Sequence, residues 1–431
     1  MRVIRETDKT MLQPERYSPA EIRKIQRACC RIFMSEKAMR SEVVSQNQRR
    51  TLRYPFLEQL TYEEVKRAYR TNVLTYHPDR HQDKQPEDID FFARHLEDVN
   101  HSYELLSTVF KGKRPDTHTV YQGRSRIIAV GGAKGGIGKS IFAANLGLQL
   151  CSLGYRTAMV DLDLGGSNLH IYLGLNQIPP TTLNDFINRR IATLDEAVVR
   201  SGHGPMLIAG NNGELGAANI PFQTKQRLIE NIRRLNADYV ILDLGGSTDF
   251  NTLDFFLAAD LGIVLTTLDQ PAYLEAYAFI KTALQRKLNR LFGVESPFPA
   301  RRNALLKEIV QEGTRAPDQD HPRTIQDLLK NVAHEDSLSL PLITDEILNF
   351  SPCLVINRCF DHQGALKVAA TLRSVACQRL SIDINHVGII SKHPFIEHST
   401  SYLSHPLITR QGANGFAIEM ESIVKTLGLT S

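Results

Sequence analysis

Features that mark membrane and secreted proteins are missing from this sequence of 431 residues. No apolar run approaches the roughly 20 residues that span a bilayer, which excludes an integral membrane protein. The first ten residues are charged and lack an apolar core, so we expect no secretory signal. The six cysteines show neither zinc-type nor CxxC spacing, and they predict small buried side chains in a reducing cytoplasm.

A strong net charge is also missing, because 51 Lys and Arg residues oppose 47 Asp and Glu residues. The balance is uneven along the chain. Residues 1–70 carry 16 basic and nine acidic side chains, whereas residues 126–431 carry 28 and 29. We therefore expect any electrostatic partner at the first 70 residues. The nearly neutral remainder gives no strong sign of DNA binding.

The first 110 residues predict helices. A capping box at Ser18–Glu21, with Pro at the first helical position, opens one of them. Apolar residues at helical spacing predict two more, over about 61–76 and 88–110. The earlier of these ends at His77, because the residue before a proline is pushed out of the α region.

From residue 126 onward, short buried strands alternate with helical segments. A Gly-rich turn and a helix over 139–153 follow the first strand. Strands are expected at 127–130, 157–161, 206–209, 239–243, 262–267, 353–357 and 386–390. This rhythm predicts an α/β fold with a doubly wound, mostly parallel sheet.

Composition and pattern divide the chain into four segments. These are a helical N-terminal segment (1–49), a small all-α module (50–110), a polar linker (111–125) and the α/β domain (126–431). Within the last, residues 285–350 break the strand–helix rhythm and predict a helical insertion. We interpret it as a surface embellishment, with a docking site as the alternative.

The strongest motif is the Gly-rich stretch GGAKGGIGKS at Gly131–Ser140, between a predicted strand and a predicted helix. Its glycines allow successive backbone N–H groups to surround phosphate oxygens, and the helix N-terminus adds partial positive charge. Lys139 supplies a charge for the β- and γ-phosphates, and Ser140 supplies a hydroxyl for Mg²⁺. The stretch therefore predicts a P-loop.

Within this stretch, KGGIGKS resembles the deviant Walker A motif of the MinD/ParA family, which includes FlhG-type flagellar regulators. The resemblance extends over roughly 126–431 outside the insertion, and it implies a P-loop NTPase fold with ATP and Mg²⁺ as cofactors. It also implies that Lys134 reaches the partner's phosphates in an ATP-dependent homodimer; a second solvated lysine is the alternative. The nucleotide-binding residues would be Gly135, Gly136, Ile137, Gly138, Lys139 and Ser140.

Polar residues after three other strands resemble further motifs of the family. In DLDLGG, Asp163 would orient the attacking water and Asp161 would support the Mg²⁺ shell; a helix-capping pair is the alternative. Asp243 ends the apolar strand YVILD and resembles a Walker B aspartate, which holds Mg²⁺ through water. Asn357 stands where the family recognises adenine, with an ordinary strand-end Asn as the alternative.

The C-terminal helix differs from that of MinD, which is basic, amphipathic and binds membranes. Here the apolar residues predict a stripe that faces the core, and no basic tail follows. The stripe consists of Phe416, Met420, Ile423, Val424 and Leu427. We therefore expect no membrane attachment through such a helix. The expected location is the cytoplasm, with recruitment to a pole or membrane site through a partner.

The segment 50–110 resembles a J-domain. A basic helix precedes the tripeptide HPD, a polar loop follows it, and an aromatic-rich helix lies beyond. The resemblance implies that the basic helix docks on an acidic surface of Hsp70 and that HPD triggers ATP hydrolysis there. The partner-binding residues would be Lys66, Arg67, Arg70, His77, Pro78 and Asp79.

This module departs from the usual J-domain, because YPFLEQL replaces the first helix and no fourth helix is obvious. Two alternatives therefore stay open. One is a helical hairpin with a solvated basic face, and the other is a J-like module with a partner other than Hsp70.

Together, the motifs predict a weak, partner-stimulated ATPase of the MinD/FlhG type, whose dimer controls the position or assembly of a cellular structure through an unidentified cargo or activator. The alternative from another class is an ATP-dependent ligase or amidase on the same fold, although no Cys has the setting of a glutaminase nucleophile. An iron–sulfur carrier would need bridging cysteines near a dimer face. Cys353 and Cys359, with five residues between them partly along a strand, fit this poorly.

Overall fold

The computed structural model resolves two compact units. It describes residues 25, 28, 29, 32, 60–77, 86–112, 125–201, 204–211, 220–292, 304–314, 324–335, 340–394, 396 and 414–429. The first unit contains the described residues within Met1–Thr119 and Leu288–Phe350. The second contains those within Val120–Lys287 and Ser351–Thr430. The helices of the insertion therefore group with the N-terminal helices and not with the sheet.

The second unit is built on an eight-stranded sheet with the order β3-β4-β2-β5-β1-β6-β7-β8. Its strands are β1 (Arg126–Gly131), β2 (Thr157–Leu162), β3 (Val198–Arg200), β4 (Met206–Ile208), β5 (Tyr239–Leu244), β6 (Leu261–Thr266), β7 (Cys353–Cys359) and β8 (Asn385–Ser391). Within the described strands, every neighbouring pair is parallel except β3 and β4. The predicted α/β class and mostly parallel sheet are confirmed.

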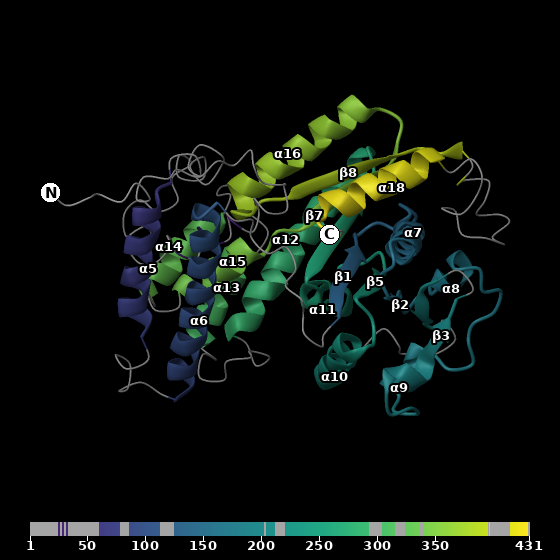
Figure 1. Cartoon of the computed structure of the whole chain (residues 1–431), viewed down its shortest axis with the longest axis horizontal. Helices are drawn as coiled ribbons and strands as arrows, with labels where there is room; N and C mark the ends of the chain where they lie inside the picture. The colour runs from purple at the N-terminus through teal and green to yellow at the C-terminus, as the bar shows by residue number, and fades with distance from the viewer. Residues whose placement is uncertain are drawn as a thin grey trace. The chain divides into compact units, whose positions relative to one another are not determined.

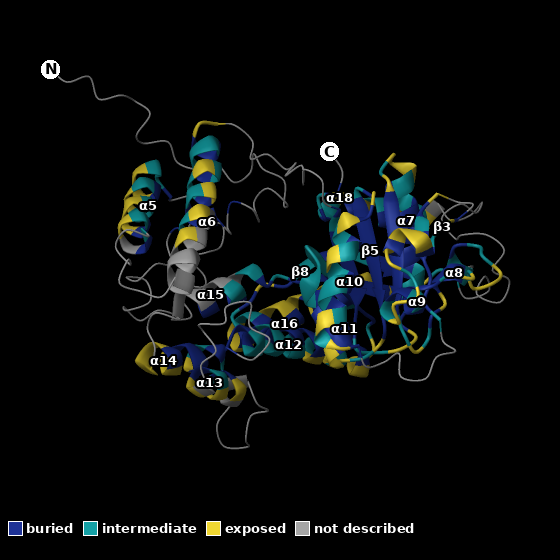
Figure 2. Cartoon of the chain, turned by 90° about the horizontal axis from the view of Figure 1, so that it is seen from below, coloured by how far each residue is buried: buried dark blue, intermediate teal, exposed yellow. Residues whose placement is uncertain are grey.

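Helices cover both faces of this sheet (Figure 1). They are α7 (Lys139–Ser152), α8 (Leu169–Tyr172), α9 (Leu183–Ile187), α10 (Phe222–Arg234), α11 (Phe250–Ala258), α12 (Gln270–Phe292), α16 (His362–Leu380) and α18 (Asn414–Thr426). Helices α7 and α18 share one apolar core with alternate strand residues. The intervening strand residues face the other way, where α11 and α16 contact the strands. The strands are consequently buried on both sides (Figure 2).

The strand order brings three separate motifs to one edge of the sheet. Strand β1 lies between β5 and β6, so the Gly-rich turn opens at the centre of the carboxyl edge. In the register of the sheet, Asp243 pairs with Val130 on one side and with Asp161 on the other. Open parallel sheets bind ligands in the crevice beyond this edge.

Most of the elements expected from the sequence are present, and the core stripe of the C-terminal helix is buried as predicted, with exposures of at most 3%. The three-residue strand β3 was not predicted. The capping box at Ser18–Glu21 and residues 113–124 of the expected linker lie outside the described residues. No helix in the described part of the chain is long and apolar enough to cross a membrane.

The first unit contains an N-terminal helical core and three helices of the insertion. Helices α5 (Tyr62–Tyr76) and α6 (Pro86–Phe110) pack together, and their apolar core includes Ile25 and Ile32 from the preceding helix. The buried amide of Asn72 donates to the carbonyl of Ile32 at 2.8 Å, which ties α5 to that helix. The insertion forms α13 (Ala304–Thr314), α14 (Ile325–Glu335) and α15 (Leu340–Asn349).

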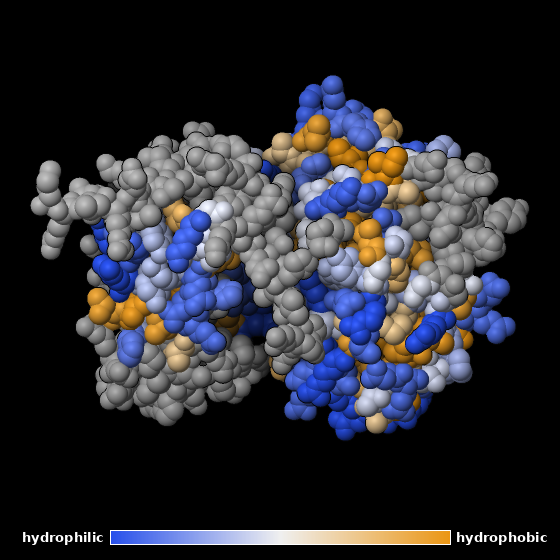
Figure 3. Space-filling view, in the orientation of Figure 1, coloured by the Kyte–Doolittle hydropathy of each residue, from blue (hydrophilic) through white to orange (hydrophobic). Residues whose placement is uncertain are grey.

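Hydrophilic and hydrophobic side chains are interspersed on the face of the second unit seen in Figure 3. Among its described residues, Phe360 is 78% exposed, and Phe250 and Ile418 are each 66% exposed. Single exposed apolar side chains are ordinary on soluble proteins.

A buried ion cluster joins three helices on one face of the sheet. Asp254 of α11 forms ion pairs with Lys225 of α10 and with Arg286 of α12, the latter at 2.9 Å. Burial raises the pKa of Asp254, but hydrogen bonds from Arg286 and Lys225 outweigh this and leave the pKa below its usual value. The carboxylate therefore stabilises the fold above its unfolded-state pKa, and this contribution is lost as the pH falls through the folded-state pKa.

We expect Asp254→Asn to lower the free energy of unfolding by about 3–5 kcal/mol at pH 7, because the buried Lys225 and the largely buried Arg286 lose their counter-ion. Urea denaturation at pH 7 and again near pH 3.5 would measure this. The difference from wild type should shrink at the lower pH, because the contribution of the wild-type carboxylate to stability begins to be lost once the pH falls below the unfolded-state pKa of about 3.9. Glu421→Gln, in an exposed pair with Lys425, should cost at most about 0.5 kcal/mol. Equal costs for the two variants would contradict the assigned role of Asp254.

Candidate nucleotide-binding site

The Gly-rich turn between β1 and α7 has the backbone conformation that its glycines allow. Gly136 and Gly138 have φ angles of +75° and +92°, in the left-handed region that favours glycine. Gly138 is the N-cap of α7, and its carbonyl accepts the first helical hydrogen bond from Phe142 at 2.9 Å. The turn therefore ends at a helix N-terminus, which favours an anion.

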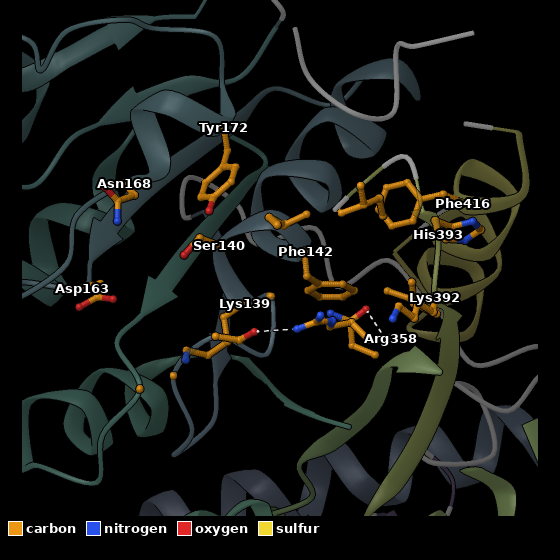
Figure 4. Close-up of a pocket in the computed structure, with 18 of the residues that line it drawn as sticks. Lys139, Ser140, Phe142, Asp163, Asn168, Tyr172, Arg358, Lys392, His393 and Phe416 are labelled. Atoms are coloured by element: carbon orange, nitrogen blue, oxygen red, sulfur yellow. Dashed lines mark hydrogen bonds between the residues drawn. The ribbon is translucent and has the colours of Figure 1, made fainter. Parts of the chain in front are cut away.

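A cavity of about 550 Å³ opens next to this turn (Figure 4). One end is formed by the turn, the start of α7 and the loops after β2 and β5. The other end is formed by the ends of β7 and β8, with α18. Its principal lining residues are Gly135, Gly136, Gly138, Lys139, Ser140, Phe142, Asp163, Asn168, Tyr172, Gly246, Asn357, Arg358, Lys392, His393 and Phe416.

Lys139 is held within the turn. Its side chain is buried, and Nζ donates to the carbonyl of Lys134 at 2.9 Å. Burial lowers the pKa of the ammonium, whereas Asp243 and Asp163 act in the opposite direction. Lys139 thus lies between the phosphate-binding turn and the carboxylates.

Two buried carboxylates lie side by side because their strands pair in register. Burial raises the pKa of Asp161 to about 7, against hydrogen bonds from the N–H groups of Leu169 and Asp163. Burial and the neighbouring Asp161 raise the pKa of Asp243 well above its usual value, against a hydrogen bond from Ser140 and the charge of Lys139. In the described part of the chain, Oδ1 of Asp243 has no hydrogen-bond partner.

These two carboxylates have different surroundings. Both oxygens of Asp161 accept backbone N–H bonds, so this residue holds the segment that carries Asp163 and the short helix α8. Asp243 has an unpartnered oxygen next to a serine hydroxyl, which is the kind of donor set that Mg²⁺ takes. The Asp243–Ser140 pair therefore fits a divalent cation.

The loops after β2 and β5 approach the turn closely. Asp163 lines the cavity and comes from the loop after β2. From the other loop, Gly246 lies so near that a methyl group on its Cα would come within 3.0 Å of the Gly135 nitrogen and 3.1 Å of Lys139 Nζ. Only glycine fits here without moving the turn, so the loop that follows the strand of Asp243 packs directly against the turn.

A polar network borders the opposite end of the cavity. Glu419 of α18 accepts hydrogen bonds from Ser391 Oγ at 2.6 Å and from His393 Nε2 at 2.9 Å. His362 Nε2 lies 3.0 Å from the same Ser391 hydroxyl. The ring of His393 also meets that of Phe416 edge to face. The network fixes the chain after β8 against α18.

Most of the residues proposed from sequence for this site meet at the cavity. Gly135, Gly136, Gly138, Lys139, Ser140, Asp163 and Asn357 line it. Ile137 and Asp161 are buried behind it, Asp243 lies next to Ser140, and Lys134 contributes its carbonyl to Lys139. Gly246, expected from sequence as flexible backbone near the γ-phosphate, also lines the cavity, whereas Arg358 and the network around Glu419 were missed. A basic residue beside Asn357 was the only signal for Arg358.

A strand, a Gly-rich turn and a helix that together face two strand-end carboxylates define a P-loop NTPase fold. In sequence comparisons, residues 123–281 match the ParA family, described as "NUBPL iron-transfer P-loop NTPase". Residues 123–281 therefore form a P-loop NTPase domain of the ParA family.

Two relatives and one solved structure illustrate the similarity. A putative septum site-determining protein MinD of Chlorella vulgaris is 30% identical over 159 residues, which cover 36% of this chain and 55% of the relative. The flagellum site-determining protein YlxH of Helicobacter pylori is 28% identical over 198 residues, 44% of this chain and 64% of the relative. The structure of MinD with Mg-ADP from Pyrococcus horikoshii is 16% identical, covers 71% of this chain and 99% of that one, and has a TM-score of 0.45. The chain thus spans little more than half the length of the curated relatives it matches.

Gly138→Ala should lower the free energy of unfolding by at least about 1–2 kcal/mol, because alanine tolerates the left-handed region poorly. Its Cβ would also come within 2.6 Å of Asn357 Nδ2. Chemical denaturation of the full chain would measure this. Gly135→Ala is the matched control, since a Cβ there meets nothing within 4 Å. If both variants were equally stable, the close packing of the turn would be wrong.

Proposed function

We propose that this chain is an ATP-dependent regulatory switch of the MinD/FlhG type, which binds ATP with Mg²⁺, dimerises and hydrolyses the nucleotide slowly. The cavity that joins Lys139, Ser140 and Asp163 to a far end lined by both apolar and polar side chains, among them Phe416 and His393, carries this proposal. It has one end suited to phosphates and another suited to a nucleoside. Its volume of about 550 Å³ lies in the range of small-molecule sites.

The phosphate end would act through fixed charges and dipoles. The N–H groups of the turn and the N-terminus of α7 would bind the β-phosphate, and Lys139 would move from the carbonyl of Lys134 onto the β- and γ-phosphates. Because the lysine is already buried, little water has to be removed when it meets the nucleotide.

Asp243 and Ser140 would hold Mg²⁺, Asp243 through a water molecule. The unpartnered carboxylate oxygen of Asp243 supports this assignment. When bound, the ion would neutralise charge on the phosphate oxygens. Asp161 would remain behind Asp243 and support this shell, by holding the segment after β2 in place.

Asp163 is the proposed residue for the hydrolytic step. It lines the phosphate end and lies in the loop after β2, where its carboxylate would orient a water molecule for in-line attack on the γ-phosphate. The products would be ADP and inorganic phosphate. Gly246 supports a switch, because its loop lies so close to the turn that a movement of the turn would be passed to the loop that leads into α11.

The proposed dimer depends on Lys134. The backbone of this residue belongs to the turn, but its side chain is not among the groups that line the cavity. We propose that it reaches the phosphates bound by the partner subunit. One relative is named as septum site-determining and another as flagellum site-determining. These names support a role in positioning a cellular structure. The cargo or activator protein would recognise the ATP-bound dimer.

With Mg-ATP, we expect Asp163→Ala to reduce phosphate release by about 100-fold or more, since the attacking water is no longer oriented. The variant should still dimerise, and adding Lys134→Ala should return it to a monomer. Phosphate release assays and light scattering would measure the two effects. Asp195→Ala, which removes an exposed carboxylate from the same unit, is the matched control.

Two results would contradict the switch. One is a monomeric Asp163→Ala variant under saturating ATP. The other is phosphate release that requires an added carboxylic acid, which is the behaviour of an ATP-dependent ligase or amidase on this fold.

We also propose that the first unit recruits an Hsp70 chaperone. Helix α5 ends at Tyr76 with His77 as its C-cap, as a J-domain helix ends before its HPD tripeptide, and Arg67 and Arg70 are exposed on it. Lys66 is partly covered, because it pairs with Glu63 at 2.8 Å and lies over the ring of Tyr62. Arg67 and Arg70 would therefore make the main contacts with an acidic surface. Pro78 and Asp79, the rest of the tripeptide, lie outside the described residues.

In the full chain, His77→Gln should abolish stimulation of a cognate Hsp70 ATPase and return its rate to the basal value. Single-turnover hydrolysis by the Hsp70 would measure this. His334→Gln removes an exposed histidine from α14 of the same unit and should leave the stimulation intact. A wild-type chain that stimulates no cognate Hsp70 would rule out the chaperone role without affecting the switch.

A further inference from the structure

Two consecutive residues at the end of β7 contact two consecutive carbonyls of the Gly-rich turn. Asn357 Nδ2 donates to the carbonyl of Ile137 at 2.7 Å, and Arg358 Nη1 donates to the carbonyl of Gly136 at 3.4 Å. The partners lie 220 and 222 residues apart in the sequence. We call this pair of side chains the P-loop brace.

The backbone at the end of β7 is shaped for these contacts. Arg358 has a φ angle of +55°, a conformation that non-glycine residues rarely adopt, and the pairing of β7 with β8 shifts between Ile356 and Cys359. The backbone N–H of Arg358 donates to Oδ1 of Asn357 at 2.9 Å. This bond fixes the orientation of the amide, so its NH₂ group faces the turn.

Peptide geometry links the brace to the phosphate end. In a trans peptide, a carbonyl and the N–H of the following residue point in opposite directions. When the carbonyls of Gly136 and Ile137 are held toward β7, the N–H groups of Ile137 and Gly138 point away from it. Backbone N–H groups aimed to one side of such a turn are what binds a phosphate.

Gly138 makes the close approach possible. A Cβ at this position would come within 2.6 Å of Asn357 Nδ2, the same atom that donates to the turn. The glycine and the asparagine therefore depend on each other. Asn357 is also buried, so its amide is not free to turn toward another partner at no cost.

We propose that Asn357 and Arg358 are positioning residues for phosphate binding, which act by holding the backbone of the P-loop. This inference rests on the proposed nucleotide-binding function and specifies it further. It differs from the expectation that Asn357 recognises adenine, because the brace acts at the phosphate end and is indifferent to the base. Arg358 supports the turn from outside, in addition to any effect of its charge.

Tripolyphosphate, ADP and GDP can distinguish a role of Asn357 in phosphate binding from a role in adenine recognition. Each would compete with a fluorescent ADP analogue in the presence of Mg²⁺. Tripolyphosphate probes the phosphate end alone, and the ratio of ADP to GDP affinity probes the base. Asn357→Ala should weaken tripolyphosphate and ADP by a similar factor, about 10-fold for a lost buried hydrogen bond to the turn. The ADP/GDP ratio should stay at the wild-type value.

Arg358→Gly isolates the guanidinium, because glycine adopts the same φ angle freely and keeps the backbone of β7. It should weaken tripolyphosphate by about 3–10-fold without lowering the melting temperature of the free protein. Arg358→Lys should recover part of the loss. Lys367→Ala removes one exposed positive charge from α16 of the same unit. It should leave the affinities for tripolyphosphate and ADP unchanged.

Other results would contradict either the brace or the proposed nucleotide-binding function. If Asn357→Ala left tripolyphosphate binding unchanged and brought the ADP/GDP ratio toward one, Asn357 would be a base reader and the brace would be wrong. The brace would also be wrong if both variants bound all three ligands like the wild type. A wild-type chain that bound none of the ligands would instead overturn the proposed nucleotide-binding function.

Discussion

The second unit depends on placing negative charge where water cannot reach it. Strands β2 and β5 pair in register, so Asp161 and Asp243 are neighbours at the carboxyl edge of a sheet that is covered on both faces. Two adjacent buried carboxylates are costly unless protons or cations compensate them. Lys139 and the hydroxyl of Ser140 supply part of that compensation, and both come from the start of α7. The geometry of the turn is thus coupled to the charge of the strands.

The parts of the site that could be predicted best from the sequence are those whose structure is determined within one stretch of chain. The glycines of GGAKGGIGKS determine their own backbone angles, and apolar runs such as YVILD are long enough to be recognised as buried strands. Asp161 and Asp243 could be proposed because each ends such a run. The local pattern was sufficient wherever neighbouring residues alone determine the structure.

The rest depends on contacts between distant segments. Strand β3 has three residues that are only half-buried or exposed, so it lacks the pattern of a strand and exists because β4 pairs with it. The positive φ angle of Arg358 follows from the shifted pairing of β7 and β8, which no residue type marks in advance. The far end of the cavity needs Ser391, His393 and Glu419 together, from β8 and α18. The grouping of the insertion with the N-terminal helices likewise appears only in three dimensions.

The place of the insertion between β6 and β7 has a consequence for the order in which the protein is made. Ile263 pairs with Cys353 in the sheet, although the whole insertion lies between them. Closing such a loop costs little more than closing a shorter one, because the entropy grows only with the logarithm of its length. Synthesis, however, proceeds from the N-terminus. The Gly-rich turn leaves the ribosome 220 residues before Asn357 does, so its support arrives only after residues 288–350 have been made. A nascent chain therefore carries an unsupported turn until Asn357 and Arg358 have been made.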